Sequence, residues 1–522
     1  MSLPTLQLPN IHQTLLFFSL STIFLLFIIC TKRVLLFSKK LTKYPPSPLK
    51  LPIIGNLHQI AGLLPHRSLR ALSDKHGPLM LLHLGQVPLL VASSPDMARE
   101  VMKTQDHLFS SRPSLKAGMT ILYDGKDVAF SPYGEYWKQV RKFSVHNLLS
   151  PKMVYSYKSI REEEVGFTLE KIRSRCAHGA VNVSEELKYL ARDIISRILL
   201  GKCLREYEWG DKIQRVISES SGLLGAFLVG DYLRGFGWMD SVTGVDGRIQ
   251  KSFKEADEIL DRIVEDEMMS AWREGDHDEF EGDSFIRILI SLEKDKTRKF
   301  PFGKDNIKAI IKDMLGAGTE STYTVMGWVM AELMKNPNTL KKLRNEIREM
   351  TTATAETTTT KGMIKEQELG KMWYLKAVIK EALRLHPPGP LLVPRELMET
   401  TQIGSYEIPQ HTRVVTNVWA ISRDPKVWEA PDEFRPERFL GSCVDFKGHD
   451  FELTPFGAGR RICPGIQFSI LIIELTIANL VHLFDWALPG SMAVEDLDMI
   501  EAPGITAPKR VDLVLDATPC FS

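Results

Sequence analysis

The chain has 522 residues, with 66 lysines and arginines against 65 aspartates and glutamates. This balance gives no charge-based argument for a nucleic-acid partner, and we expect no such partner. The length allows a large core and suggests more than one domain. The six cysteines are scattered, with no Cys-x-x-Cys pair and no histidine cluster at zinc spacing. This usage argues against a disulfide framework or a zinc site and suits a reducing compartment.

The N-terminal segment contains an almost unbroken apolar run from Leu15 to Cys30, followed by five basic residues up to Lys43. Neighbouring apolar residues extend the run to about the 20 residues that span a bilayer. No basic segment precedes the run and no small-residue cleavage site follows it, which argues against a cleaved signal peptide. Because the basic residues lie on its C-terminal side, the remaining chain is placed in the cytosol. We therefore predict that residues 1–31 form an uncleaved transmembrane anchor in the endoplasmic reticulum membrane.

Residues 32–52 are basic and proline-rich, with Pro45, Pro46 and Pro48 close together. Consecutive prolines favour a stiff extended backbone, so we interpret this segment as a spacer that holds the globular part off the membrane. An ordinary loop is the alternative. Residues 53–522 then form one large domain.

The domain begins with two apolar runs, 79–84 and 88–92, which meet at Gly85 and Gln86 and predict a β-hairpin. Beyond Asp96 the pattern is mostly helical until the 390s, with solvent loops expected at 274–283 and 351–360. Short strand-like pieces return around 402–408 and 412–417. The sequence therefore predicts a mainly α fold with small β-sheets.

Two of the predicted helices carry polar side chains at informative spacings. Trp137 and Arg141 are four residues apart and share a helix face, while Lys138 and Lys142 share the neighbouring face. Taken alone, this pattern also fits a packed tryptophan beside a solvated arginine. Farther along, Glu381 and Arg384 form an i, i+3 pair that by itself contributes only a few tenths of a kcal/mol.

Residues 305–336 have the apolar period of one long helix, which Asn336 and Pro337 end. Inside it, Ala317 and Gly318 are small enough to let a flat ligand approach the backbone. Glu320 and Ser321 place a carboxyl beside a hydroxyl, and such a pair can relay protons. Alternatively, the serine hydroxyl bonds back to its own helix.

Residues 456–465 place one cysteine in a glycine-bracketed loop before a long apolar helix that begins at Ile466. Glycine permits positive φ angles and a close approach of the backbone to a flat ligand. Cys463 precedes a helix N-terminus, where the helix dipole favours a thiolate, and a thiolate in such a loop is a natural axial ligand for haem iron. The alternatives are a structural loop cysteine and a dinucleotide-binding loop, and the latter lacks its third glycine.

The pattern Phe-x-x-Gly-x-Arg-x-Cys-x-Gly is formed here by Phe456, Gly459, Arg461, Cys463 and Gly465. It resembles the haem-binding loop of the cytochrome P450 family. The resemblance runs from the anchor to about residue 515. Within the family, the sequence is similar to the plant microsomal members of the large A-type group, the family-71-like proteins. It implies the cytochrome P450 fold, mainly α with small sheets, in which residues 53–522 are the haem-containing catalytic domain.

The resemblance also assigns roles to individual residues. Cys463 would ligate the iron of haem b, and Glu320 and Ser321 would be the acid and alcohol of the oxygen-activation motif, with serine where the family usually has threonine. A structural network is implied for Glu381, Arg384 and Arg438. The other implied haem contacts are Trp137, Arg141, Arg395, Phe456 and Arg461. The implied substrate-pocket residues are Tyr123, Leu223, Ala317, Leu392, Val393 and Ile505.

The function implied by the resemblance is that of a monooxygenase. It would oxidise a small apolar plant specialised metabolite, such as a coumarin, terpenoid or alkaloid, with O₂ and electrons from NADPH. No dinucleotide fingerprint is present, so the electrons would come from a separate NADPH–cytochrome P450 reductase, which we expect to dock partly on Lys138 and Lys142. The alternatives are a haem-thiolate lyase or dehydratase, for example one that acts on aldoximes, and a haem-binding membrane protein without catalysis.

Overall fold

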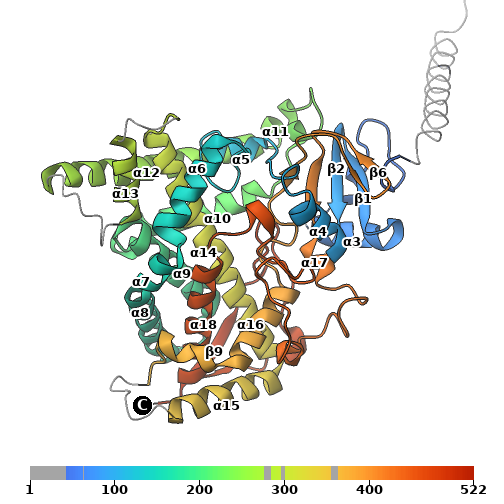
Figure 1. The fold of residues 1–522 in the computed structure, drawn as a ribbon. Coiled ribbons are helices and arrows are strands. Elements are labelled where there is room, and N and C mark those ends of the chain that lie inside the picture. The colour runs from blue at the N-terminus through green and yellow to red at the C-terminus, as the bar shows by residue number, and fades with distance from the viewer. Residues whose placement is uncertain are drawn as a thin grey trace, which may run out of the picture.

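The computed structural model describes residue 21 and residues 43–60, 62, 64–274, 284–294, 300–353 and 362–521. Helices form most of this part of the chain, and a small sheet lies to one side of them, at the right of Figure 1. The mainly α fold with small sheets is therefore confirmed. The predicted loops at 274–283 and 351–360 fall largely outside the described residues, as does the predicted anchor except for Ser21.

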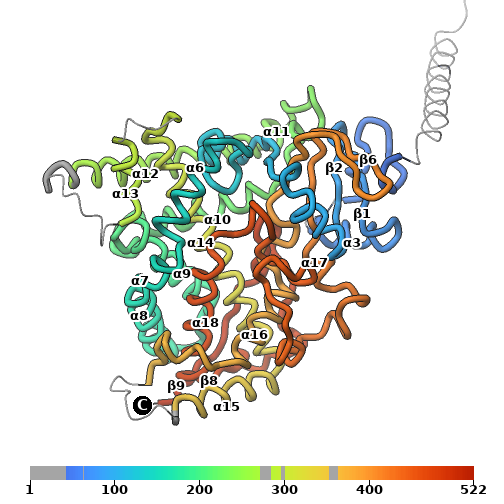
Figure 2. The backbone as a smooth tube through the Cα atoms, viewed as in Figure 1, coloured from blue at the N-terminus to red at the C-terminus, as the bar shows by residue number. Residues whose placement is uncertain are grey.

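The main sheet has four strands in the order β1-β2-β7-β4. Its strands are β1 (Leu79–Leu84), β2 (Val87–Ala92), β4 (Arg395–Glu396) and β7 (Arg413–Thr416). The predicted hairpin is confirmed, because β1 and β2 pair antiparallel on either side of Gly85, whose φ of +59° favours glycine. Strand β7 pairs parallel to β2, which brings together two segments that are far apart in the sequence; Figure 2 shows their blue and orange segments side by side.

Two smaller sheets complete the strand content. A separate hairpin is formed by β5 (Thr401–Ile403) and β6 (Tyr406–Ile408). A three-stranded sheet of order β3-β9-β8 joins β3 (Val181–Asn182), β9 (Val514–Pro519) and β8 (Phe484–Ala487). The sequence pattern did not indicate this last sheet, because β3 is only two residues long and its partner lies at the other end of the chain.

The central element is α14 (Lys304–Lys335), which confirms the long helix predicted at 305–336 to within one residue. It is buried along most of its length, and α9 (Val183–Leu200), α10 (Gly210–Leu224), α12 (Val245–Glu274), α16 (Trp373–Leu385) and α18 (Ile466–Leu483) pack against it. In Figure 1, α14 and α18 lie near the middle of the molecule, with α9 and α16 on either side. The large core is built around this group of helices.

The remaining helices surround this centre. They are α2 (Leu57–Ile60), α3 (Pro65–His76), α4 (Pro95–Arg99), α5 (Lys116–Ile121), α6 (Glu135–Ser144), α7 (Pro151–Ser156), α8 (Lys158–Cys176), α11 (Trp238–Val242), α13 (Phe285–Lys294), α15 (Pro337–Ala353) and α17 (Val418–Ile421). Short 3₁₀ or π-helical turns lie at Glu100–Thr104, Val145–Leu149, Leu204–Glu206, Val229–Asp231, Glu366–Lys371, Pro436–Phe439, Gly459–Arg461 and Val494–Asp496.

The proline segment does not extend freely from the domain. The carbonyl of Pro46 accepts a hydrogen bond from the N–H of Leu81 in β1 at 3.0 Å, and Asn56 Nδ2 donates to the carbonyl of Pro48 at 3.3 Å. The expectation of a spacer is therefore corrected for these residues, because their carbonyls bond to the domain around β1. Within the described chain, α18 is the one helix long and apolar enough to span a membrane, but it is mostly buried in the core.

Glu381, Arg384 and Arg438 form the network that the sequence suggested. Both carboxylate oxygens of Glu381 accept from Arg384, at 2.7 and 2.9 Å, and one of them also accepts from Arg438 at 2.9 Å. Arg384 donates in addition to the carbonyls of Ser422 and Pro431. Because Glu381 and Arg384 are completely buried, this pairing fixes α16 against the chain segment that leads to the cysteine loop.

Candidate functional site

The cysteine loop, residues 456–465, is closed by its own backbone. The N–H of Cys463 donates to the carbonyl of Phe456 at 2.9 Å, and the N–H of Ile462 donates to the carbonyl of Gly459 at 3.1 Å. Gly459 has a φ of +71°, and a Cβ there would lie 2.1 Å from the carbonyl oxygen of Met102. Only glycine fits this approach, so the loop is seated directly on the turn at 100–104.

Cys463 is half-buried and lies just before the first turn of α18. Burial raises the pKa of its thiol, while a hydrogen bond from the Gly465 backbone and the charge of Arg141 lower that pKa. We expected this position to favour a thiolate, but in the protein alone burial outweighs these two effects and the thiol pKa is raised. A bound metal ion reverses this balance, because a coordinating thiol loses its proton.

Four arginine side chains gather around this loop. Arg461 donates to the carbonyls of Ser110 and Ser131 at 2.8 and 2.7 Å, Arg395 donates to the carbonyl of Ala458 at 2.9 Å, and Arg141 donates to the carbonyl of Ile462. The fourth, Arg112, donates to the carbonyls of Ala129, Val393 and Pro394. Sequence reasoning missed Arg112, because a lone arginine in a loop carries no spacing signal.

These guanidinium groups are short of negative charge. Burial, together with the charges of the neighbouring Arg395 and Arg141, lowers the pKa of Arg461 to about 9. Burial also lowers the pKa values of Arg112 and Arg141. Among the described residues, no carboxylate lies within ion-pair distance of Arg112, Arg141 or Arg461. Their guanidinium groups donate to carbonyl oxygens instead. Asp127 compensates little, because burial and the nearby Asp313 raise its pKa.

The indole ring of Trp137 packs against two arginines of this cluster. Its indole N–H donates to the carbonyl of Val128 at 3.0 Å, and the Arg461 and Arg141 guanidinium carbons lie 3.9 and 5.5 Å from its ring centroid. Trp137 and Arg141 therefore share a face as predicted. In this structure the indole supports the arginines by cation–π contact rather than presenting a free donor.

The donor set fits a haem group. A cysteine at the end of a glycine loop can ligate its iron, and arginines without carboxylate partners can bind its two propionates in bidentate pairs. Opposite the loop, Ala317 is exposed although it lies in the middle of the buried α14. Asp313, which raises the pKa of Cys463, lies one turn earlier on the same helix, so this exposed stretch faces the cysteine side.

Glu320 and Ser321 are adjacent in sequence but point in different directions. The buried carboxylate of Glu320 accepts from Ser218 of α10 at 2.9 Å and from Tyr323 at 3.4 Å, and burial raises its pKa. The Ser321 hydroxyl donates to the carbonyl of Ala317 at 2.8 Å, which is the bond back to the helix considered above. The expectation that Gly318 admits a flat ligand is corrected. A Cβ there would lie 3.1 Å from Ile195, so the missing side chain allows close packing against α9.

The predicted pocket residues do not all lie together. Leu223, Val393 and Ile505 belong with α5 to one apolar cluster. Leu392 instead packs against the core of the main sheet and approaches Gly457 of the cysteine loop. Tyr123 lies apart, because its hydroxyl donates to Asp257 of α12 at 2.7 Å and its ring lines a cavity of about 300 Å³ between α5, α12 and the start of α14.

Asp106 is a second residue that the sequence did not reveal. Its carboxylate accepts from Arg395 at 2.8 Å and from both the backbone N–H and the side chain of Arg460 at 3.0 Å. It therefore ties the cysteine loop to β4 and to the turn at 100–104. No local spacing indicates this role, since its partners lie hundreds of residues away.

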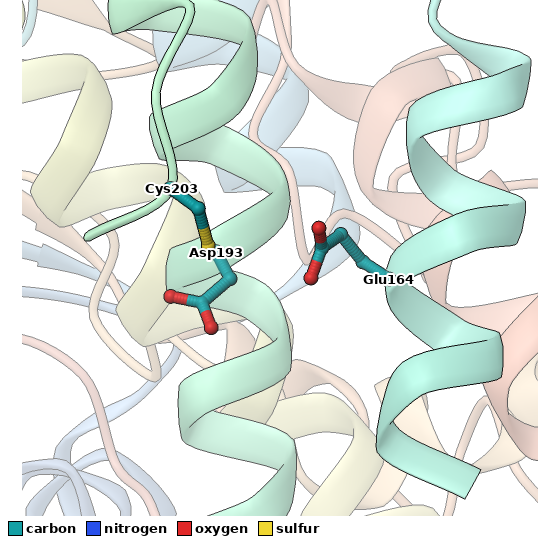
Figure 3. Close-up of side chains that lie close together, drawn as sticks. All are labelled: Glu164, Asp193 and Cys203. Carbon is teal, nitrogen blue, oxygen red and sulfur yellow. The ribbon is translucent and has the colours of Figure 1, made fainter. Parts of the chain in front are cut away.

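A cluster of possible metal ligands lies elsewhere, between α8 and the end of α9. Figure 3 shows Glu164 facing Asp193 and Cys203, and their ligand atoms lie within 4.8 Å of one another. Glu164 already accepts from Arg197 and Arg205, and Asp193 pairs with Arg192 and Arg205. Burial raises the pKa of Cys203 to about 12. This cluster is therefore a buried ion-pair network that joins two helices.

Comparisons with known proteins agree with the site. A family model described as Cytochrome P450 matches residues 45–513. Cytochrome P450 71A4 of Solanum melongena is 47% identical over 476 residues, which is 91% of this chain and 92% of that protein. (+)-Menthofuran synthase of Mentha piperita is 44% identical over 505 residues, covering 97% and 99% of the two chains. A zebra fish cytochrome P450 solved with abiraterone shares the fold, with a TM-score of 0.70 at 23% identity, covering 87% of this chain and 99% of its own.

Asp106→Asn should loosen the cysteine loop, because the neutral amide weakens charge-assisted bonds to Arg395 and Arg460. We expect haem to be lost from the purified variant several-fold faster on transfer to apomyoglobin, with the backbone fold retained by circular dichroism. Asp74→Asn, which changes an exposed carboxylate, is the matched control. Equal haem loss from the variant, the control and the unchanged protein would show that Asp106 does not hold the loop.

Proposed function

Because this chain belongs to the cytochrome P450 family, we propose that it is a haem-thiolate monooxygenase of a small, mostly apolar plant metabolite, with Cys463 as the iron ligand. The family uses haem and takes electrons from NADPH through a reductase, and the chain matches its plant 71-type members over nearly all of its length. The observation that carries the proposal is the placement of Cys463 beside three buried or half-buried arginines without carboxylate partners, which is a site built for an anionic, metal-containing ring.

Each part of the chain has a role in this proposal. When bound, haem b supplies the activation of O₂ and the transfer of one oxygen atom. Arg112, Arg141 and Arg461 would turn from backbone carbonyls to the propionates, and Arg395 would join them while remaining tied to Asp106. Phe456 would flank the group, because its carbonyl closes the loop around Cys463. The network of Glu381 keeps this loop in register with the core.

Ser321 and Glu320 are proposed to manage protons. Ser321 lies one turn from the exposed Ala317, so its hydroxyl can rotate from the Ala317 carbonyl and donate through water into the space above Cys463. The carboxyl of Glu320 accepts a hydrogen bond from Ser218, and burial raises its pKa. Glu320 can therefore hold a proton, which the hydroxyl of Ser321 would pass on. A serine hydroxyl is less fixed than that of a β-branched threonine.

The apolar cluster around Leu223, Val393 and Ile505 supports a substrate such as a coumarin, terpenoid or alkaloid. One relative is named for (+)-menthofuran, which supports a small organic molecule. The lyase alternative has no specific observation in its favour.

For the location in the cell, we propose that residues 1–31 are the anchor in the endoplasmic reticulum membrane and that the domain at 53–522 lies in the cytosol.

Cys463→Ala tests the iron ligand. We expect this variant to lose the red-shifted Soret band of the reduced CO complex, together with all product formation, because alanine offers no thiolate. Cys443→Ala, at an exposed cysteine, is the control and should keep both. A CO spectrum that is unchanged in Cys463→Ala would refute the proposed site.

Ser321 tests the reaction class. Without the hydroxyl, proton delivery is impaired, so Ser321→Ala should form less product per NADPH and release more hydrogen peroxide, while Ser321→Thr should hold or raise the yield. The thiolate spectrum and ligand binding should persist in both. Product, NADPH and peroxide are measured together. Product formation that is independent of both NADPH and Ser321→Ala would favour a lyase instead.

The reductase is proposed to dock partly on α6, where Lys138 and Lys142 are exposed beside Trp137. Reversing both to Glu should slow reduction, most clearly at low salt, because exposed charges are screened beyond about 8–10 Å at physiological ionic strength. Lys251→Glu, on the exposed face of α12, is the control. Stopped-flow reduction at equal rates in all three proteins at low salt would place the docking surface elsewhere.

A further inference from the structure

Lys312 is a buried lysine of α14 whose ammonium has no hydrogen-bond partner. Its side chain is only 8% exposed, and Nζ finds neither a carboxylate nor a carbonyl within bonding distance. Two lysines on the preceding turns of the same helix are fully paired. Lys308 binds Asp257 and Asp261 at 2.6 and 2.9 Å, and Lys304 binds Asp261 and Glu265 at 3.0 and 2.7 Å.

The surroundings of Lys312 are largely apolar. Its ammonium lies 5.8 Å from the ring centroid of Phe253 on α12, and Phe253 meets the ring of Tyr123 edge-on. One turn before Phe253, Ile249 belongs to the same apolar cluster as Leu223. Burial lowers the pKa of Lys312 to about 7, and the more distant charge of Asp257 opposes that shift only in part. The ammonium is thus placed where α14 meets the edge of the apolar cluster.

Open space lies one turn beyond Lys312 on the same stripe of the helix. At Gly316, apart from its chain neighbours and the helix backbone, no atom lies within 4 Å of the position that a Cβ would take. Ala317, the exposed residue of the central stretch, is next to it. A ligand can therefore extend from the ammonium toward the side of α14 that faces Cys463.

An unpaired ammonium in such a place is unfavourable for folding. Burying a charge is strongly unfavourable unless the charge is neutralised or paired. Methionine has nearly the same length and shape and would fill the position without that cost. A charged residue that lowers stability and has no hydrogen-bond partner in the protein is most simply explained by a ligand that provides that partner.

We propose that Lys312 is a specificity-determining residue that binds a carboxylate of the substrate, so that the substrate is a mostly apolar molecule with one carboxylate group. This inference rests on the proposed function and narrows its substrate class. The apolar body of the molecule contacts the cluster around Leu223 and Ile249, while the carboxylate replaces the missing counter-charge of Lys312. The neutral coumarins and terpenoids expected from the apolar pocket are then poorer ligands than their acidic relatives.

Spectral titration of the full-length haem protein tests this inference. The probes are dodecanoate, cinnamate and naphthoate, each beside its methyl ester, at mildly acid pH, where Lys312 is protonated and the probe carboxylates are ionised. We expect wild-type protein to bind at least one acid more tightly than its ester. Lys312→Met should weaken the binding of that acid by about tenfold or more, as expected for the loss of one charge-assisted bond, and should leave the affinity for the ester unchanged.

Thermal unfolding of the same proteins provides an independent readout. Lys312→Met should unfold at a higher temperature than wild type without ligand, because it removes an unpaired buried charge. Lys304→Met, which removes a paired lysine on the same helix, should leave the ratio of acid to ester binding unchanged.

The inference is overturned if every ester binds as well as its acid, if Lys312→Met keeps the acid preference, or if Lys312→Met lowers the unfolding temperature. The last result would show that Lys312 has a structural partner. In each of these cases the proposed function still holds if the reduced CO complex keeps its red-shifted band and product formation depends on NADPH.

Discussion

The site depends on guanidinium groups buried beside Cys463 without enough negative charge around them. Arg112, Arg141 and Arg461 donate to main-chain carbonyls, which satisfy their hydrogen bonds but not their charge. Burial lowers their pKa values because the charged form is poorly solvated there. In the proposed function, the two propionates of haem would offset this cost, so residues that lower the stability of the protein alone would stabilise its complex with haem. Folding and haem binding would then be coupled through charge.

The cysteine loop is held from several directions, and each contact has a separate physical basis. Gly459 lets the loop touch the carbonyl of Met102, where any side chain would collide. Asp106 binds the loop through Arg460 and binds β4 through Arg395. Glu381 fixes the preceding segment through two arginines. A thiolate ligand must keep one position relative to its metal, and these contacts restrict the loop without using the sulfur itself.

Much of this arrangement could be predicted from the sequence, because the informative residues are close together along the chain. Trp137 with Arg141, Glu320 with Ser321, and the loop around Cys463 are local patterns, and the long helix has an unmistakable period. Arg112, Asp106 and the sheet formed by β3 and β9 could not be found in this way, because their partners are distant in sequence. Gly318 was misassigned for a related reason: a small residue fits both a ligand and a neighbouring helix, and only packing against Ile195 distinguishes them.

Helix α14 shows how a buried element reveals its function through polar residues. Asp313 is satisfied by the N–H groups of Val128 and Ala129, and Glu320 by Ser218, so these carboxylates are explained by the protein. The hydroxyls of Thr319 and Thr322 also lack partners, but neutral hydroxyls cost much less to bury than a charge. Lys312 is different because its charge is unexplained by the fold. Among the described residues of this helix, Lys312 is the buried ammonium that has no hydrogen-bond partner, and a ligand accounts for it better than packing does.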